Sequence, residues 1–272
     1  MGVGLRLDCP ALACPAGDCA GPLAGAGRCA APPFRQPGWL ATPNHSSADL
    51  TSMRFLAVVA KRPAAGQTKT RLCPPLRGEQ AAALYECFLR DTLAIMRAVE
   101  SEERAIVYLP EGEEAYFERL APDFRLFPQR GDDLGARLDN LLGHALGNGA
   151  THAVVMDSDS PTLPAAYVAA AFAHLQAGAD VVFGPCDDGG YYLVGLSRRQ
   201  PRLLREVEMS TPRVLADSLA IAQELGLRVA LLPTWYDVDT AAELERLRQE
   251  LRHLPPVVAV ATRAWFATDG GL

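Results

Sequence analysis

Two Asp-x-Asp pairs are the residues of this chain best suited to hold a divalent cation. Asp157 and Asp159 follow an apolar run in Met-Asp-Ser-Asp-Ser-Pro, and Asp237 and Asp239 form a later Asp-Val-Asp segment. Side chains at i and i+2 of an extended chain point to the same side, and carboxylates are ligands that Mg²⁺ and Mn²⁺ prefer. We therefore predict a metal site of Asp157, Asp159 and Asp239. Turn and cap chemistry is the structural alternative, because Asp239 precedes Thr240 at a helix start.

A cationic loop supplies the second chemical signal. Residues 61–72 read Lys-Arg-Pro-Ala-Ala-Gly-Gln-Thr-Lys-Thr-Arg-Leu, so four cations lie within eleven residues of a chain whose net charge is −6. Exposed N–H groups together with Lys or Arg side chains bind phosphate. The predicted phosphate-binding residues are Lys61, Gly66, Lys69, Thr70 and Arg71. A solvated basic loop is the alternative, and neither a Walker A loop nor a G-x-G-x-x-G fingerprint is present.

A glycine-rich segment with acids and tyrosines is the third candidate. Residues 184–192 read Gly-Pro-Cys-Asp-Asp-Gly-Gly-Tyr-Tyr. Paired glycines allow a ligand to approach the backbone, and a neighbouring Asp or Tyr can bind or stack on a sugar-like group. The predicted substrate-binding residues are Asp188, Gly189, Gly190, Tyr191 and Tyr192, with Asp188 as the candidate base. Asp-Gly-Gly is also a good hairpin turn without any function. Cys186 has no His partner in the motif, so it is not interpreted as a nucleophile.

Strands and helices that alternate along the chain must position these residues. Apolar runs predict strands at 55–60, 104–109, 152–156, 180–184, 191–196 and 228–232. Apolar residues at helical spacing predict helices at about 79–99, 133–147, 164–177, 212–225 and 240–252. Such alternation predicts an α/β sandwich with a mostly parallel sheet covered on both faces, and the short turn inside 180–196 predicts one antiparallel pair. Ligands of such folds lie at the carboxyl ends of the strands, just after 60, 156 and 184.

Composition excludes several other classes of protein. The chain is 49% hydrophobic and carries 26 Lys and Arg against 32 Asp and Glu, so it can bury a core but offers no basic surface for a nucleic acid. No apolar run reaches the length of a membrane-spanning helix. We therefore expect neither nucleic acid nor membrane as a partner. Oligomerisation cannot be read from the sequence.

The two ends of the chain differ from its centre. Residues 1–52 are rich in Ala, Gly, Pro and Cys and lack periodicity, so we expect a disordered extension and regard Met53 as the preferred start. We expect a catalytic domain over 53–252 and a C-terminal tail over 253–272. Four of the seven cysteines lie in the extension, and no export signal is present. We therefore expect a cytoplasmic protein.

Five motifs, in this order, resemble one known family. They are Val-Ala-Lys-x-Pro-x-x-Gly-x-x-Lys-Thr-Arg-Leu at 59–72, Gly-Asp-Asp-Leu-Gly-x-Arg-Leu at 131–138, Asp-Ser-Asp-Ser-Pro at 157–161, Gly-Pro-x-x-Asp-Gly-Gly-Tyr-Tyr-Leu at 184–193 and Asp-Val-Asp-Thr at 237–240. The pattern, which covers about residues 53–248, resembles the GT-A-fold family long labelled a domain of unknown function and often described as arsenosugar-biosynthesis-type glycosyltransferases. More distantly, it is similar to phospholactate and molybdenum-cofactor guanylyltransferases.

This resemblance implies a fold and a location for a nucleotide. The fold would be a single GT-A-like, nucleotide-diphospho-sugar-transferase three-layer sandwich with a mixed, mostly parallel sheet. The nucleotide would lie across the first strand, with Lys69 and Arg71 on its phosphates and Asp159 on the metal. Asp239 would be a second metal ligand, and 188–192 would face the acceptor.

The resemblance also implies contacts to the base or ribose. The segment 129–138 would border that part of the nucleotide. Gly131 and Gly135 would let the backbone approach it, and Arg137 would join the nucleotide-binding residues.

Two reactions and one non-catalytic role fit these expectations. In glycosyl transfer, an acceptor hydroxyl attacks the anomeric carbon of a nucleotide sugar while Mg²⁺ or Mn²⁺, Lys69 and Arg71 stabilise the departing nucleoside diphosphate. In nucleotidyl transfer, a phosphorylated acceptor attacks a nucleoside triphosphate and releases pyrophosphate, which favours two metals with Asp159 and Asp239 acting together. A scaffold that keeps the fold without turnover is the third hypothesis. We expect a transferase and prefer glycosyl transfer.

Overall fold

A seven-stranded mixed sheet forms the centre of the protein. The computed structural model describes residues 52–268, so the predicted extension lies outside the described residues except for Ser52. The strands are β1 (Arg54–Lys61), β2 (Glu103–Leu109), β3 (Arg125–Pro128), β4 (His152–Met156), β5 (Val181–Pro185), β6 (Tyr191–Leu196) and β7 (Val229–Leu231). Their order across the sheet is β3-β2-β1-β4-β6-β5-β7.

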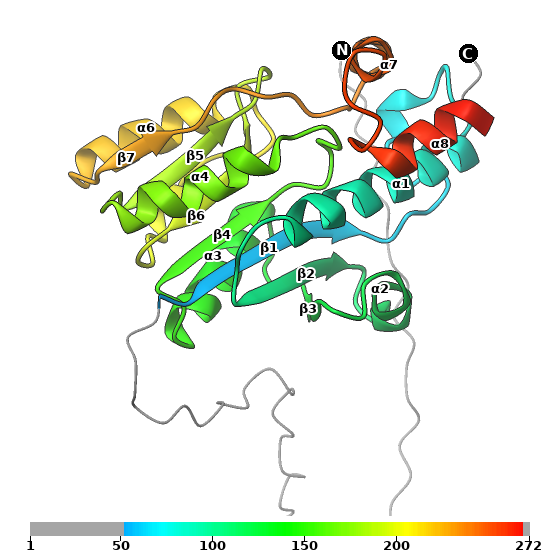
Figure 1. Cartoon of the computed structure of the whole chain (residues 1–272). Coiled ribbons are helices and arrows are strands. Elements are labelled where there is room, and N and C mark those ends of the chain that lie inside the picture. The colour runs from blue at the N-terminus through cyan, green and yellow to red at the C-terminus, as the bar shows by residue number, and fades with distance from the viewer. Residues whose placement is uncertain (1–51, 269–272) are drawn as a thin grey trace, which may run out of the picture. The chain divides into compact units, whose positions relative to one another are not determined.

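Helices cover both faces of this sheet (Figure 1). They are α1 (Gly78–Arg97), α2 (Glu114–Leu120), α3 (Leu134–Gly147), α4 (Ala165–Gln176), α5 (Arg202–Arg205), α6 (Val214–Glu224), α7 (Ala241–Leu251) and α8 (Val260–Thr268). A short 3-10 helix, Thr70–Leu72, lies in the loop after β1. All five predicted helices and all six predicted strands are present, with ends within about two residues of the expected positions.

Strand β6 is antiparallel to both of its neighbours, β4 and β5, whereas every other pairing in the sheet is parallel. The predicted antiparallel pair within 180–196 is thus confirmed. Because β6 runs in the opposite direction, its first residues, Tyr191 and Tyr192, lie at the same edge of the sheet as the last residues of β4 and β5. We call this edge the carboxyl edge.

Alternation along β1 divides the core into two layers. Leu56, Val58 and Ala60 pack with the apolar residues of α1, α2 and α4 on one face. Phe55 and Ala57 pack with α3, α5 and α6 on the other face. Successive side chains of a strand point to opposite faces, so a strand buried on both sides is apolar throughout. The predicted three-layer α/β sandwich is confirmed.

A third apolar cluster extends the fold beyond the predicted domain end. Helix α8 packs on α1, with Trp265 and Thr262 buried. The Asp91 carboxylate of α1 accepts hydrogen bonds from the N–H groups of Ala261 and Thr262, each at 2.9 Å. Part of the predicted tail over 253–272 is therefore a packed helix. Its first turn is satisfied by a side chain distant in sequence, a contact that no local pattern reveals.

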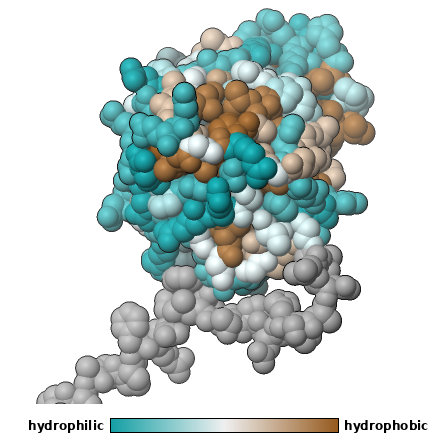
Figure 2. Space-filling view, turned by 90° about the vertical axis from the view of Figure 1, so that its left-hand side faces the viewer, coloured by the Kyte–Doolittle hydropathy of each residue, from teal (hydrophilic) through white to brown (hydrophobic). Residues whose placement is uncertain are grey.

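The opposite end of the domain carries an exposed edge strand. Val229 and Leu231 of β7 are exposed, and Figure 2, which views this end, shows apolar surface bordered by hydrophilic surface. Over the described range 52–268, no helix combines the length and apolarity needed to cross a bilayer.

Candidate active site

The segments that follow β1, β4, β5 and β7 meet at the carboxyl edge. The segment after β7 crosses this edge, because the Trp235 N–H donates to the Pro185 carbonyl at 2.9 Å and the Val238 N–H donates to the Asp159 carbonyl at 3.0 Å. This path, visible in Figure 1 as the chain between β7 and α7, brings 237–239 beside 157–159. The two Asp-x-Asp pairs are therefore neighbours in space.

Lys69 lies between the two pairs. Its Nζ is 2.9 Å from Asp159 Oδ1 and 2.6 Å from Asp239 Oδ1, and its side chain is 5% exposed. Burial disfavours the ammonium charge, but attraction to Asp159 and Asp239 outweighs burial and raises the pKa of Lys69. Lys69 is thus a fixed positive charge at neutral pH. Its backbone is left-handed, with φ 49°, a conformation uncommon outside glycine and concentrated at functional sites.

Asp239 binds cations with its side chain and does not act as the helix cap. Besides Lys69, its carboxylate accepts from Arg71 Nη1 at 3.1 Å, and the Arg71 side chain is 69% exposed. The cap of α7 is instead closed by Glu243, whose carboxylate accepts from the N–H groups of Asp239 at 3.1 Å and Thr240 at 2.5 Å. The alternative that the Asp239 side chain caps helix α7 is therefore wrong.

Asp157 and Asp237, the other acids of the two Asp-x-Asp pairs, lie where a negative charge is disfavoured. Burial raises the pKa of Asp157 well above its usual range, and the nearby negative charges of Asp159 and Asp237 raise it further. The pKa of Asp237 is raised to about 6, mainly by burial and then by the negative charges of Asp239 and Asp188. The Asp157 carboxylate accepts from the Asp159 N–H at 3.2 Å, and the described residues include no ion-pair partner for it. Carboxylates crowded in this way favour the arrival of a cation.

The donor set fits a hard divalent ion. Asp157, Asp159 and Asp239 present carboxylate oxygens, which Mg²⁺ and Mn²⁺ prefer, and the cluster holds more carboxylates than cations. The Lys69 ammonium supplies part of the balancing charge in the arrangement seen here. That Asp157, Asp159 and Asp239 would hold such an ion remains a prediction, because these three are not a group whose ligand atoms all lie within 4.8 Å of one another among the described residues.

Two adjoining clefts open at this cluster. The first, which we call the cationic cleft, has a volume of about 560 Å³. Its charged and polar lining includes Lys61, Gln67, Thr68, Lys69, Thr70, Arg71, Gln129 and Arg137. The second, the acidic cleft, has a volume of about 470 Å³. Its lining includes Asp188, Gly190, Tyr191, Tyr192, Met209, Ser210, Thr211, Pro212 and Asp237. Asp157, Asp159, Asp239 and Arg71 line both clefts, so the acids mark the boundary between them.

The predicted site residues divide between these clefts, with four exceptions. Lys61, Lys69, Thr70, Arg71 and Arg137 line the cationic cleft. Asp188, Gly190, Tyr191 and Tyr192 line the acidic cleft, and Asp157, Asp159 and Asp239 line both. Neither lining, as far as the described residues go, includes Gly66, Gly131, Gly135 or Gly189.

At two of these positions, backbone packing explains why the residue is glycine. A Cβ on Gly135 would collide with the Leu204 carbonyl oxygen, so this glycine lets α3 approach α5. Gly131 has φ 140°, and a Cβ there would lie 2.8 Å from the Arg137 backbone nitrogen. Both positions therefore require glycine without any ligand. Their predicted approach to a base remains a prediction.

Tyr85 of α1 is a site residue that the sequence did not reveal. Its hydroxyl accepts from the Lys61 N–H at 3.0 Å and lies 2.9 Å from Ser158 Oγ. Burial raises the pKa of Tyr85 to about 12, so it stays protonated and can donate to Ser158. The contact joins the end of β1 to the Asp-Ser-Asp loop. A Tyr on the apolar face of a helix looks like an ordinary core residue in sequence.

The loop 209–212 was also missed as part of the site. It lies at the start of the predicted helix 212–225, and Met209, Ser210, Thr211 and Pro212 line the acidic cleft. The Tyr191 hydroxyl lies 3.7 Å from Met209 Sδ, which ties the loop to β6. Ser210 has φ 63°, a left-handed conformation rare for serine. That backbone feature is visible in the structure alone.

Comparisons with known proteins agree with this architecture. Residues 92–211 match the family described as "Uncharacterized protein conserved in bacteria (DUF2064)". A protein of Desulfovibrio desulfuricans G20, provisionally named a nucleotide-diphospho-sugar transferase, is 28% identical with a TM-score of 0.75; the alignment covers 81% of this chain and 96% of that protein. No curated protein matches in sequence.

A more distant structure shares the fold alone. The 4-diphosphocytidyl-2C-methyl-D-erythritol synthase of Anaerococcus prevotii DSM 20548 is 10% identical with a TM-score of 0.50, over 73% of this chain and 96% of that one. These matches confirm the resemblance drawn from the motifs: the chain has a GT-A-like, nucleotide-diphospho-sugar-transferase-type fold and matches the family of unknown function over residues 92–211.

Proposed function

We propose that this protein is a metal-dependent glycosyltransferase that moves a sugar from a nucleotide sugar to a hydroxyl group of a small acceptor. One observation carries the proposal: two clefts meet at a carboxylate cluster, and Lys and Arg side chains gather in only one of them. A nucleotide sugar carries its negative charge on the diphosphate. The cationic cleft suits that diphosphate, and the acidic cleft suits an uncharged acceptor.

The cationic cleft has the chemistry of a diphosphate site. Lys61, Lys69, Arg71 and Arg137 are its four cations among the described residues. Cations and N–H groups at a strand end bind phosphate oxygens through charge-assisted hydrogen bonds. Its lining extends to Gln129, whose side-chain amide donates to the Ala60 and Val107 carbonyls at 3.2 and 3.0 Å and so joins β1 to β2. The provisional name of the Desulfovibrio relative supports the same ligand class.

The acidic cleft argues against a phosphorylated acceptor. Five carboxylates line it, those of Asp157, Asp159, Asp188, Asp237 and Asp239. Arg71 is its one Lys or Arg among the described residues, and Arg71 is paired with Asp239. A phosphate brought beside so many carboxylates would be repelled, whereas a hydroxyl group can donate hydrogen bonds to them. This charge pattern favours glycosyl over nucleotidyl transfer.

The reaction follows from these positions. The acceptor oxygen attacks the anomeric carbon, the bond from that carbon to the diphosphate oxygen breaks, and the hydroxyl proton passes to a carboxylate of the acidic cleft. Asp188 is our candidate for that base, because it is exposed and accepts a hydrogen bond from the Gly190 N–H at 2.8 Å that fixes its orientation. Lys69 and Arg71 stabilise the negative charge of the departing nucleoside diphosphate. A divalent ion on Asp157, Asp159 and Asp239 would supply further charge neutralisation there.

Nucleotidyl transfer is the second candidate, favoured by one specific observation. Asp159 and Asp239 both contact the Lys69 ammonium, so the two acids lie close enough to act together, as a reaction at phosphorus with two metals would need. The substrate would then be a nucleoside triphosphate and the leaving group pyrophosphate.

Ligand-dependent thermal stabilisation separates these candidates. Nucleotide sugars, nucleoside diphosphates and nucleoside triphosphates are tested with and without Mg²⁺ or Mn²⁺. A ligand that binds only the folded state at a hundredfold excess over its Kd stabilises by about 2.7 kcal/mol. A metal-dependent response to one nucleotide sugar supports glycosyl transfer, and a response restricted to a triphosphate supports nucleotidyl transfer. No response to any nucleotide would favour a non-catalytic scaffold. Arg71→Ala should weaken the response, and Arg90→Ala on α1, outside both clefts, is the matched control.

A further inference from the structure

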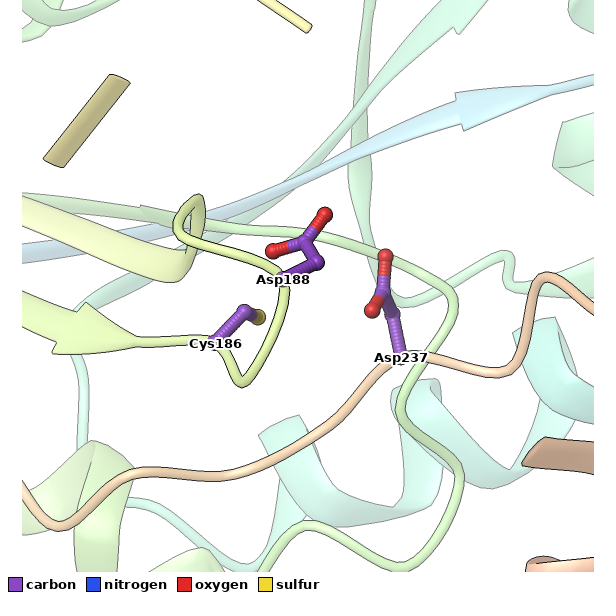
Figure 3. A group of neighbouring side chains, drawn as sticks. All are labelled: Cys186, Asp188 and Asp237. Carbon is purple, nitrogen blue, oxygen red and sulfur yellow. The ribbon is translucent and has the colours of Figure 1, made fainter. Parts of the chain in front are cut away.

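A cysteine and two acids converge in the acidic cleft. Cys186, Asp188 and Asp237 each offer a ligand atom, and these atoms all lie within 4.8 Å of one another. Figure 3 shows the three side chains grouped together, with Cys186 and Asp237 on either side of Asp188. All three residues line the acidic cleft. Neither Cys186 nor Asp188 belongs to the all-oxygen group of Asp157, Asp159 and Asp239.

The backbone holds these residues in place from two sides. Within the turn after β5, the Cys186 N–H donates to the Gly190 carbonyl at 3.0 Å, which closes the loop that carries Asp188. The turn is joined to the segment after β7 by a parallel bridge between Cys186 and Trp235, and the Asp187 N–H donates to the Trp235 carbonyl at 3.0 Å. Asp237 is therefore anchored opposite the turn. The three ligand atoms are brought together by main-chain bonds that need no ion.

The Cys186 thiol is buried and without a partner in the described part of the chain. The residue is 8% exposed, its sulfur takes part in no disulfide, and it makes no hydrogen bond with any described residue. In Figure 3 the sulfur lies beside Asp188, with Asp237 on the other side of that residue. Cys186 packs in the apolar cluster that includes Tyr192 and Leu193, and its sulfur also lies within 4.8 Å of a carboxylate oxygen of Asp188 and of Asp237.

The cations near this cluster are occupied elsewhere. Arg246 Nη1 pairs with Asp187 at 2.6 Å, Lys69 pairs with Asp159 and Asp239, and Arg71 pairs with Asp239. Neither Asp188 nor Asp237 forms an ion pair within residues 52–268. The negative charge of these two acids is thus left without a counter-ion from the chain.

We propose that Cys186, Asp188 and Asp237 form a second divalent-metal site, selective for ions of the Zn²⁺ class that accept sulfur. Zn²⁺ binds Cys sulfur and Asp oxygen, and three protein ligands leave one coordination position open. Mg²⁺ favours oxygen and selects the other cluster, so the two sites differ in ligand chemistry. Binding converts the thiol to a thiolate and releases one proton to solvent. An ion held here would bind Asp188, so Asp188 would serve as the base of the proposed transfer only while this second site is free of metal. The metal site itself stands whether or not the protein transfers a sugar.

Cd²⁺ is the probe that tests this site, because cadmium bound to a thiolate gives an ultraviolet charge-transfer band. The full-length chain is used with Cys9, Cys14, Cys19 and Cys29 replaced by serine, which removes the thiols outside the described residues. Excess Mg²⁺ is present throughout to occupy the all-oxygen cluster. We expect a saturable band that Cys186→Ser removes and that the matched control Cys73→Ser keeps. Asp237→Asn should weaken Cd²⁺ binding at least about tenfold, the lower end of what loss of an outer-shell partner costs.

The opposite results would overturn the proposal. They are a band that persists in Cys186→Ser, a band lost equally in Cys73→Ser, or Cd²⁺ that Mg²⁺ displaces competitively. Should Cys186→Ser fail to fold, alkylation of the unsubstituted Cys186 followed by peptide mass spectrometry gives a second readout. Zn²⁺ should then protect Cys186 from alkylation in the presence of Mg²⁺ while leaving Cys73 equally reactive. Equal reactivity of Cys186 with and without Zn²⁺ would contradict the site.

Discussion

Lys69 Nζ lies 2.6 Å from Asp239 Oδ1, across 170 positions of sequence. The same ammonium contacts Asp159, so one buried cation joins the loop after β1 to both Asp-x-Asp segments. The contact couples the phosphate-binding loop to the acids that would hold a metal.

Replacing Lys69 with Met should weaken nucleotide binding and lower stability. Asp159 and Asp239 would then face each other without the shared cation, and loss of a buried hydrogen-bonded partner costs about 1–3 kcal/mol. A divalent ion can replace the missing charge. Mg²⁺ should therefore raise the free energy of unfolding of Lys69→Met by more than it raises that of the unsubstituted protein. Urea unfolding with and without Mg²⁺ measures both effects, with Arg90→Met as the control. An unchanged unfolding midpoint together with an unchanged Mg²⁺ response would remove Lys69 from the centre of the site.

Replacing Asp159 with Asn should abolish the metal-dependent part of nucleotide stabilisation. The amide keeps the size of the side chain but removes the charge that a divalent ion requires. Thermal unfolding with nucleotide, with and without Mn²⁺, measures the difference. Asp217→Asn on α6, a half-buried residue that is paired with Arg213 and lines neither cleft, is the control. If Asp159→Asn keeps the full metal-dependent shift, Asp159 is not a ligand.

Asp237 should make stability depend on pH in one direction. Its pKa in the folded protein is raised to about 6, above the usual value of 3.8, so the folded state binds the proton more tightly than the unfolded state. Stability contributed by this group therefore falls as pH rises from about 4 to about 6 and stays low above it. Asp237→Asn should raise the free energy of unfolding at pH 8, with a gain that disappears near pH 4. Urea unfolding in EDTA tests this; an equal effect at both pH values would contradict the assignment.

Gly135 and Gly147 of helix α3 should respond oppositely to alanine. A Cβ at Gly135 would collide with the Leu204 carbonyl, and overpacking costs about 1–3 kcal/mol. A Cβ at Gly147 meets no atom within 4 Å, so Gly147→Ala should be neutral or should stabilise by up to about 1 kcal/mol through helix propensity. Chemical denaturation of the two variants compares them directly. A stable Gly135→Ala variant would show that the α3–α5 contact is not close-packed.

Asp91 should stabilise the C-terminal helix that the sequence did not predict. Asp91→Ala removes the acceptor for the N–H groups of Ala261 and Thr262, and loss of such a cap costs about 0.5–2 kcal/mol. Hydrogen exchange should then increase in α8 more than in α4. Glu86→Ala, which removes a half-buried acid of the same α1 helix that pairs with Arg90, should leave α8 protected. Equal exchange of α8 in both variants would exclude the cap.

Local patterns in the sequence were sufficient for most of the fold. β1, β4 and β6 are apolar runs bounded by polar residues or turns, and their limits were predicted closely. Strand β3 reads Arg-Leu-Phe-Pro, and four residues ending in proline carry almost no period-2 signal. Helix α2 has seven residues and α5 has four, too few for a helical period to show.

The site was predictable where chemistry is local and missed where it depends on packing. The Asp-x-Asp pairs and the cationic loop are contiguous motifs, so their residues could be named in advance. Tyr85 and loop 209–212 enter the clefts only through tertiary contacts. The place of Asp237 opposite Cys186 depends on a bridge between β5 and the segment after β7, which no single motif encodes.

The central claim is that the protein transfers a sugar. The most direct test identifies the products formed from whichever nucleotide gives the largest stabilisation of the protein. Phosphorus NMR follows that nucleotide in the presence of Mg²⁺ or Mn²⁺ and a panel of neutral hydroxyl compounds and their phosphorylated counterparts. Glycosyl transfer predicts metal-dependent accumulation of a nucleoside diphosphate from a nucleotide sugar with a neutral acceptor, and loss of that product in Lys69→Met. Release of pyrophosphate from a nucleoside triphosphate with a phosphorylated acceptor would contradict it.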